Sequence, residues 1–123
     1  MALTTDIWAV TPSFSATLYR AAAAIAGAGD ITLITNQPLD NGAGYQVLFT
    51  CAGDATAATF TITGYVAGDL SQSVTTETVA GVDSGTATST NYYSRITSIS
   101  SDAAVATNVS IGNAIADGTA LPR

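Results

Sequence analysis

The stretch YQVLFTC at residues 45–51, followed after a turn by TFTIT at residues 59–63, decides the fold. Apolar and polar side chains alternate in both runs, which places every second residue on one face of a β-strand. The shared apolar faces hold Tyr45, Val47, Phe49 and Cys51 in the first run, and Phe60 and Ile62 in the second. Leu48 lies on the opposite face of the first run, which predicts a central strand covered on both sides.

Further segments of the chain carry the same strand signal. They are the short run 30–34, the Thr- and Val-rich run 73–79, and the runs 92–100 and 105–111. The run 73–79 predicts a strand with polar surroundings, and in the last run Val105, Val109 and Ile111 share one face. Ile96 and Ile99 have opposite parity, which implies a bulge or two buried faces.

Turn signals separate these runs. They stand at residues 40–42, 52–54, 67–69, 83–85 and 101–102, where Asp, Asn, Ser and Gly cluster. Six or more short strands at close spacing are typical of an antiparallel sandwich or barrel. We therefore expect an all-β protein, an antiparallel β-sandwich of jelly-roll-like form with an extended N-terminal arm.

Residues 17–28 allow two interpretations. Their alanine content favours a helix by propensity, but Ala-rich strands occur in sandwiches and no good N-cap residue precedes the stretch. The strand is the preferred interpretation, and the helix stays the alternative.

The chain divides by composition into an arm at residues 1–16, a β-sandwich domain at 17–112 and a tail at 113–123. The arm carries a large apolar content, contributed by Ile7, Trp8, Val10 and Phe14. These four residues are candidates for docking onto a neighbouring subunit. The other interpretation, in which Trp8 plugs one end of the sandwich of its own chain, is the preferred one for Trp8.

The composition excludes several function classes. The chain has no His, no Lys, one Glu and 20 Thr, and charged residues make up 10% of it. Catalysis near neutral pH relies mostly on residue types that are absent or scarce here, so we expect no enzyme. The net charge of −6, with Arg20, Arg95 and Arg123 as the only cations, also disfavours nucleic acid and anionic membranes as partners. Neutral Thr, Ser and Ala lose little side-chain entropy when another surface covers them.

No cofactor is expected from the residue types. One Cys and no His cannot form a zinc site, and the lone Cys51 is interpreted as a small core residue. Calcium is the one remaining option, with Asp40 beside Asn41, or Asp54 with Asp69, as oxygen donors. The preferred interpretation is that the three aspartates are solvated residues of turns.

Two surface features bear on partners. The predicted strands hold no Lys and no Pro, the residues that commonly protect sheet edges, so either the sheet closes on itself or neighbours cover its edges. Tyr92 and Tyr93, with Asn91 and Arg95, resemble a carbohydrate-binding patch. Because adjacent strand residues point to opposite faces, only one of the two tyrosines can point outward.

Residues 77–112 carry a resemblance to a known class. The pattern ETV at 77–79, STNYY at 89–93, ITSI at 96–99 and NVSIG at 108–112 resembles small virion structural proteins of tailed bacteriophages. In such proteins this region resembles a series of hairpins within a β-sandwich, and there are no catalytic residues to carry over.

The resemblance implies a capsid decoration or cement protein, located in the virion after assembly in the host cytoplasm. Its partners would be the major capsid protein or other virion proteins, and the chain would form a homo-oligomer, a dimer or a trimer. Tyr92 and Tyr93 join the four arm residues as interface candidates. A neck, tail or fibre component and a carbohydrate-binding or adhesin-like module are the alternatives.

Overall fold

A computed structural model describes residues 17–33, 45–67 and 73–114 of the chain. These residues form eight strands and no helix. The strands are β1 Arg20–Ile25, β2 Gly29–Asp30, β3 Gln46–Asp54, β4 Thr59–Val66, β5 Val74–Ala80, β6 Asp83–Thr88, β7 Tyr93–Ser101 and β8 Val105–Ala114. The predicted all-β class is confirmed.

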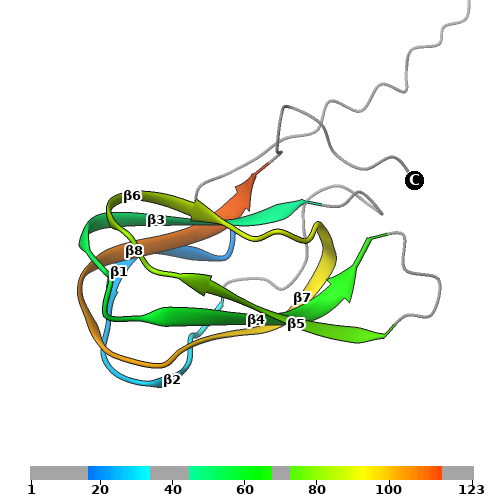
Figure 1. Ribbon diagram of the computed structural model, residues 1–123, viewed down its shortest axis with the longest axis horizontal. Coiled ribbons are helices and arrows are strands. Elements are labelled where there is room, and N and C mark those ends of the chain that lie inside the picture. The colour runs from blue at the N-terminus through cyan, green and yellow to red at the C-terminus, as the bar shows by residue number, and fades with distance from the viewer. Residues whose placement is uncertain (1–16, 34–44, 68–72, 115–123) are drawn as a thin grey trace, which may run out of the picture.

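The strands form two four-stranded antiparallel sheets that pack face to face (Figure 1). Sheet A has the order β1-β8-β3-β6, and sheet B has the order β2-β7-β4-β5. Every connection except the β4–β5 hairpin passes from one sheet to the other. This order is that of an eight-stranded jelly roll, so the predicted jelly-roll-like sandwich is confirmed.

The core lies between the two sheets and comes from the alternating strands. Val47, Phe49, Phe60 and Ile62 are completely buried, as the alternation predicts. Phe49 of sheet A stacks on Phe60 of sheet B, with ring centroids 4.6 Å apart and an interplanar angle of 7°. Such a pair contributes about 0.5–1.5 kcal/mol beyond its buried area. The two runs that predict the fold therefore meet at the centre of the sandwich.

Bulges adjust the strands that depart from strict alternation. The β4–β7 ladder shifts register between the pairs Thr63–Ser98 and Gly64–Ile96, so Ile96 and Ile99 both face the core and are both 0% exposed. Their opposite parity implied a bulge or two buried faces, and the bulge is confirmed. Strand β3 is central, between β8 and β6, but its outward Leu48 is only half-buried.

The structure corrects several expectations about element positions. The strand expected at 30–34 is confined to Gly29–Asp30 in β2, and residues 31–33 are not in a strand. The helix alternative for residues 17–28 is wrong, because β1 pairs with β8 across that stretch. Residues 52–54, expected as a turn, extend β3, and the turn follows at residues 56–57. Residues 83–85, also expected as a turn, begin β6, where Ser84 adopts a positive φ of 54°. Turn-type residues start this edge strand because a bulge tolerates them.

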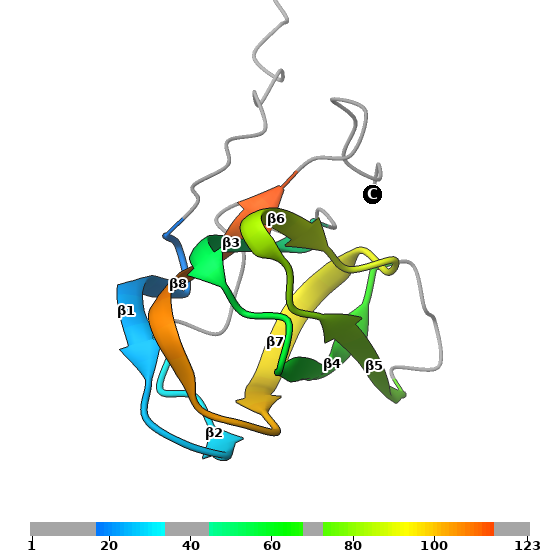
Figure 2. The same cartoon turned by 60° about the vertical axis from the view of Figure 1, so that its left-hand side comes forward.

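The ends of the chain are described in part. Residues 1–16, the predicted arm, lie outside the described residues, and so do 115–123. Strand β8 runs to Ala114, past the expected domain boundary at 112, and Asn113 is completely buried. Figure 2 shows that β1 and β2 form one lateral side of the sandwich and that β5 and β6 lie on the other.

Candidate functional site

The only glutamate of the chain organises the β5 and β6 side of the sandwich. Glu77 lies on edge strand β5 opposite Ile62, so its side chain points to the inner face. Its Oε2 accepts a hydrogen bond from the Thr90 amide at 2.6 Å, and its Oε1 accepts one from the Asn91 amide at 3.1 Å. The Tyr93 hydroxyl also donates to Oε1, at 2.8 Å. We name Glu77, Thr90, Asn91 and Tyr93 the Glu77 cluster.

The segment that Glu77 holds is the crossover from β6 in sheet A to β7 in sheet B. Ser89 ties the same crossover to sheet A, because its hydroxyl accepts from the Val47 amide at 2.9 Å and donates to the Asn91 carbonyl at 2.8 Å. Ser89 is 1% exposed. The crossover is therefore anchored to both sheets through polar side chains that are satisfied inside the chain.

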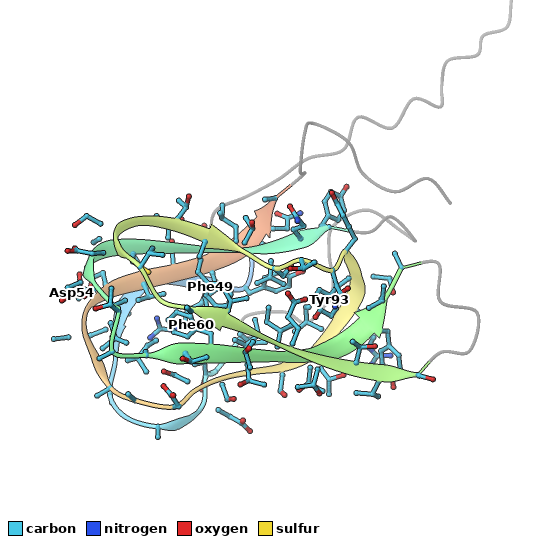
Figure 3. All side chains as sticks on the ribbon, in the orientation of Figure 1. Phe49, Asp54, Phe60 and Tyr93 are labelled. Atoms are coloured by element: carbon cyan, nitrogen blue, oxygen red, sulfur yellow. The ribbon has the colours of Figure 1, made fainter. Side chains whose placement is uncertain are left out.

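The backbone closes the same end of the sandwich. Tyr45 precedes β3 and Tyr93 begins β7, and the two residues exchange backbone hydrogen bonds of 3.1 and 2.8 Å. Burial raises the pKa of the Tyr93 phenol above its ordinary value, and the neighbouring Glu77 carboxylate raises it further. Figure 3 shows Tyr93 between the two sheets, in the same interior layer as Phe49 and Phe60. Asp54 lies at the other end of the sandwich from Tyr93.

The outer face of sheet B carries an array of small neutral hydroxyls. Cross-strand registers align Ser100, Thr61 and Thr78 in one row and Ser98, Thr63 and Thr76 in the next. These side chains are half-buried or exposed.

The next row on that face contains larger side chains. Tyr65 of β4 lies between Arg95 of β7 and Val74 of β5. Val74 is the one large hydrophobic side chain among the described residues that is exposed, at 54%. We name these three residues the Tyr65 row. Reasoning from the sequence missed Tyr65, although it continues the outward parity of Thr61 and Thr63.

The sequence-predicted interface residues divide into two groups. Ile7, Trp8, Val10 and Phe14 lie outside the described residues. Tyr93 is 0% exposed, so its side chain belongs to the core, whereas the neighbouring Tyr92 is half-buried. Tyr92 precedes β7, so of the two tyrosines only Tyr92 keeps solvent exposure. Arg95 is exposed but lies beside Tyr65, on the outer face of sheet B.

Two of the described aspartates accept hydrogen bonds from threonines of the fold. The Asp54 carboxylate accepts from the Thr56 hydroxyl at 2.6 Å and from its amide at 2.9 Å, and these bonds lower the Asp54 pKa. Asp102 accepts from the Thr59 amide at 2.8 Å. The described residues contain no group of three or more His, Cys, Asp or Glu that could hold a metal ion. Asp40, Asn41 and Asp69, named for calcium, lie outside the described ranges.

An open pocket of about 370 Å³ lies between β1 and β2, beside Arg20 and Asp30. The Arg20 guanidinium donates to three backbone carbonyls, those of Ala23, Ala24 and Val109, at 2.7–2.8 Å. Burial lowers its pKa. Arg20 therefore binds the irregular end of β1 to β8. Cys51 is a buried free thiol in β3.

No protein-family model, no curated protein and no solved structure matches the chain. Within the described part of the chain, no helix has the length and apolarity needed to cross a membrane. The fold class is therefore established from the strand topology alone: an eight-stranded jelly-roll β-sandwich.

Proposed function

We propose that this chain is a non-enzymatic virion structural protein of a tailed bacteriophage. In this role it is a capsid decoration or cement protein that binds the major capsid protein and stabilises the head. The observation that carries the proposal is the outer face of sheet B, where rows of Thr and Ser hydroxyls form a neutral surface. The assignment to a tailed bacteriophage rests on the resemblance of residues 77–112 to small virion structural proteins.

The physical chemistry of that face suits repeated protein contacts. Thr and Ser have little rotamer entropy to lose when a partner covers them, in contrast to Lys and Glu, each of which loses up to about 2 kcal/mol. Their hydroxyls both donate and accept hydrogen bonds, so they can be satisfied by a partner or by trapped water. Each copy would contact two or more capsid subunits, and even weak contacts repeated over a lattice become collectively strong.

The negative net charge supports an outward position on the head. The net charge is −6, and charges of the same sign repel the packaged DNA and favour a capsid surface that exposes Arg or Lys. By analogy of fold alone, jelly rolls recur both in viral capsid proteins and in lectins. A neck, tail or fibre component would use the same surface at lower copy number.

A carbohydrate-binding module is the second candidate, and the Tyr65 row favours it. An aromatic ring beside an exposed guanidinium offers an apolar face for a sugar ring and donors for its hydroxyls. This arrangement replaces the patch of Tyr92, Tyr93, Asn91 and Arg95, since Tyr93 is buried. A glycan array probed with the full chain and with Tyr65→Ala tests it. Binding that the variant loses would favour this function over the structural role.

The deciding experiment for the main proposal is quantitative mass spectrometry of purified particles, scaled to the major capsid protein. Copies in the hundreds support a cement protein on the capsid lattice. A count of about six to a few dozen moves the chain to the neck, tail or fibres, where symmetric rings hold few subunits. Absence of the chain from the particles rejects the virion proposal.

A further inference from the structure

The sandwich has four sheet edges, and three of them are interrupted. Strand β2 has only two residues, Gly29 and Asp30. Strand β1 shifts register twice against β8, and the Arg20 side chain binds carbonyls at its end. Short, bulged and charge-bearing edges resist pairing with another chain.

Strand β6, the fourth strand of sheet A, is interrupted at its start. Its ladder with β3 shifts register between Cys51 and Asp54, and Ser84 there has a positive φ of 54°. The Ser84 hydroxyl donates to Asp83 at 2.9 Å, which places a charge at the bulge. An incoming strand would therefore meet a twisted and charged edge at this end.

Strand β5 differs from the other three edges. It pairs with β4 over seven consecutive residues, from Val74 to Ala80, without a register shift. It is the last strand of sheet B, so within the described ranges no strand pairs with its other side. Its outward residues are the exposed Val74, Thr76, Thr78 and Ala80. This is a regular and neutral edge, which is a template for strand addition.

We propose that β5 pairs antiparallel with β5 of a second copy around a two-fold axis at Thr76. Sheet B would then continue across the axis as one eight-stranded sheet, as an isologous interface requires. Val74 would lie opposite Thr78 of the other copy, and Thr76 would lie opposite its own equivalent. The pairing covers the 54% exposed Val74, and cross-strand Thr–Thr pairs are favourable.

Glu77 sets the register of this pairing. A register shift of one residue would place the outer face of one β5 beside the inner face of the other. The two-fold axis must therefore pass through a residue, so that the hydroxyl faces of both copies lie on the same side. An axis at Glu77 would place two glutamates directly opposite each other, which is destabilising. An axis at Thr76 places Glu77 opposite Thr75 of the other copy. An axis at Thr78 also separates the glutamates but leaves Val74 outside the paired stretch.

The inward position of Glu77 does not block the pairing. An inward charge protects an edge when pairing would leave it without partners. Glu77 already accepts three hydrogen bonds, from Thr90, Asn91 and Tyr93, inside its own chain. The carboxylate therefore stays satisfied when a second strand covers the edge. The outer face of the paired β5 strands carries no charge. On the inner face the two Glu77 side chains lie diagonally, about 7–8 Å apart, and not directly opposite each other.

This inference concerns the purified chain and stands without the proposed virion role. Two paired edges bury less than a standard interface of about 1,600 Å², so the dimer is expected to be weak, with a Kd of about 10 μM to 1 mM. Sedimentation equilibrium of the full chain over this concentration range measures it directly. A chain that stays monomeric to about 1 mM overturns the proposal.

The variant Thr76→Lys/Thr78→Lys places two charges on the outer face of β5. We expect it to raise the dimer Kd at least about tenfold, because lysines of two copies would face each other across the edge. The matched control is Thr86→Lys/Thr88→Lys on β6, which changes the same residue type at the same spacing and at exposed positions. The control should shift the Kd less than about threefold. An equal loss of dimer affinity in both variants, or a larger loss in the control, would place the interface elsewhere.

Cysteine cross-linking tests the register. Directly opposed residues of antiparallel strands have Cα atoms about 4.5–5.5 Å apart, within the range of a disulfide. Thr76→Cys should therefore form a covalent dimer under mild oxidation. Thr78→Cys should not, because its two copies would be about 13 Å apart along the strands. The buried Cys51 is present in both variants. Cross-linking of Thr78→Cys, or of neither variant, contradicts an axis at Thr76.

Discussion

The hydroxyl of Tyr93 donates a 2.8 Å hydrogen bond to Oε1 of Glu77, and this bond joins the edge strand β5 to the first residue of β7. The two residues lie on either side of β4, the strand that pairs with both of theirs. The bond therefore spans sheet B on its inner face. Through Thr90 and Asn91 the same carboxylate also holds the crossover that arrives from sheet A.

Replacing the carboxylate by an amide tests how much the Glu77 cluster stabilises the fold. Glu77→Gln keeps the shape but leaves one acceptor oxygen and places an NH₂ group against a backbone N–H donor. We expect the free energy of unfolding to fall by about 1–3 kcal/mol, as for lost bonds to a charged group. Urea denaturation measures it. The exposed Thr78→Gln, on the same strand, should change stability by less than about 0.5 kcal/mol. Equal stability of Glu77→Gln and the parent chain would show that the cluster is not stabilising.

Gly81 lies at the passage from β5 in sheet B to β6 in sheet A, where its amide donates to the Ala58 carbonyl at 2.9 Å. A Cβ added there would collide with the backbone carbonyl of Ala55. Gly81→Ala should therefore lower the free energy of unfolding by about 3 kcal/mol or more, since backbone atoms must move. Gly27→Ala is the control, because a Cβ at Gly27 meets nothing within 4 Å. Thermal unfolding of the two variants should differ widely, and similar melting temperatures would contradict the predicted collision.

The strands with strict alternation could be predicted from the sequence. The runs at 45–51 and 59–63 contain the residues that meet in the Phe49–Phe60 stack. The opposite parity of Ile96 and Ile99 predicted either a bulge or two buried faces, and the ladder contains the bulge. In these segments the buried face is continuous, so the pattern of side chains follows the pairing directly.

The edge strands were harder to predict, for a physical reason. Strand β6 begins with Asp-Ser-Gly, residues that also favour turns. An edge strand can begin with them because it buries few side chains and tolerates a bulge. The Ala run of β1 has no alternation, and only pairing with β8 determines its state. The outward direction of Tyr65 follows from the parity of its own strand, but its neighbours Arg95 and Val74 depend on registers between strands. The role of Glu77 depends on such registers too, and the sequence of a single strand does not contain them.

Deleting residues 1–14 tests the role of the apolar arm. If Trp8 and its apolar neighbours dock onto another subunit, the truncated chain should bind purified heads at least about tenfold more weakly and still fold. Its melting temperature should then fall by less than about 4 °C, corresponding to less than about 1 kcal/mol. Calorimetry and co-sedimentation with heads measure the two effects. A large drop in melting temperature would instead place Trp8 in the core of its own chain.

High pH should destabilise the protein through its buried tyrosines. Burial raises the pKa of Tyr19, and the nearby Tyr45 raises it further, while burial is also the main cause of the raised pKa of Tyr93. In the unfolded chain a tyrosine has a pKa of about 10. Above that pH the unfolded state loses phenolic protons that the folded state keeps, so the folded state binds more protons and stability falls as the pH rises.

The free energy of unfolding is expected to fall by up to about 1.4 kcal/mol per pH unit for each of the two tyrosines, beginning near pH 10. Urea denaturation at intervals between about pH 8 and 11.5 measures it, with stability expected to be flat in the lower part of this range. Tyr19→Phe removes one ionisable group and should reduce the slope by about half. An unchanged slope in that variant would mean that Tyr19 ionises alike in the folded and unfolded chains, against its 1% exposure in the core.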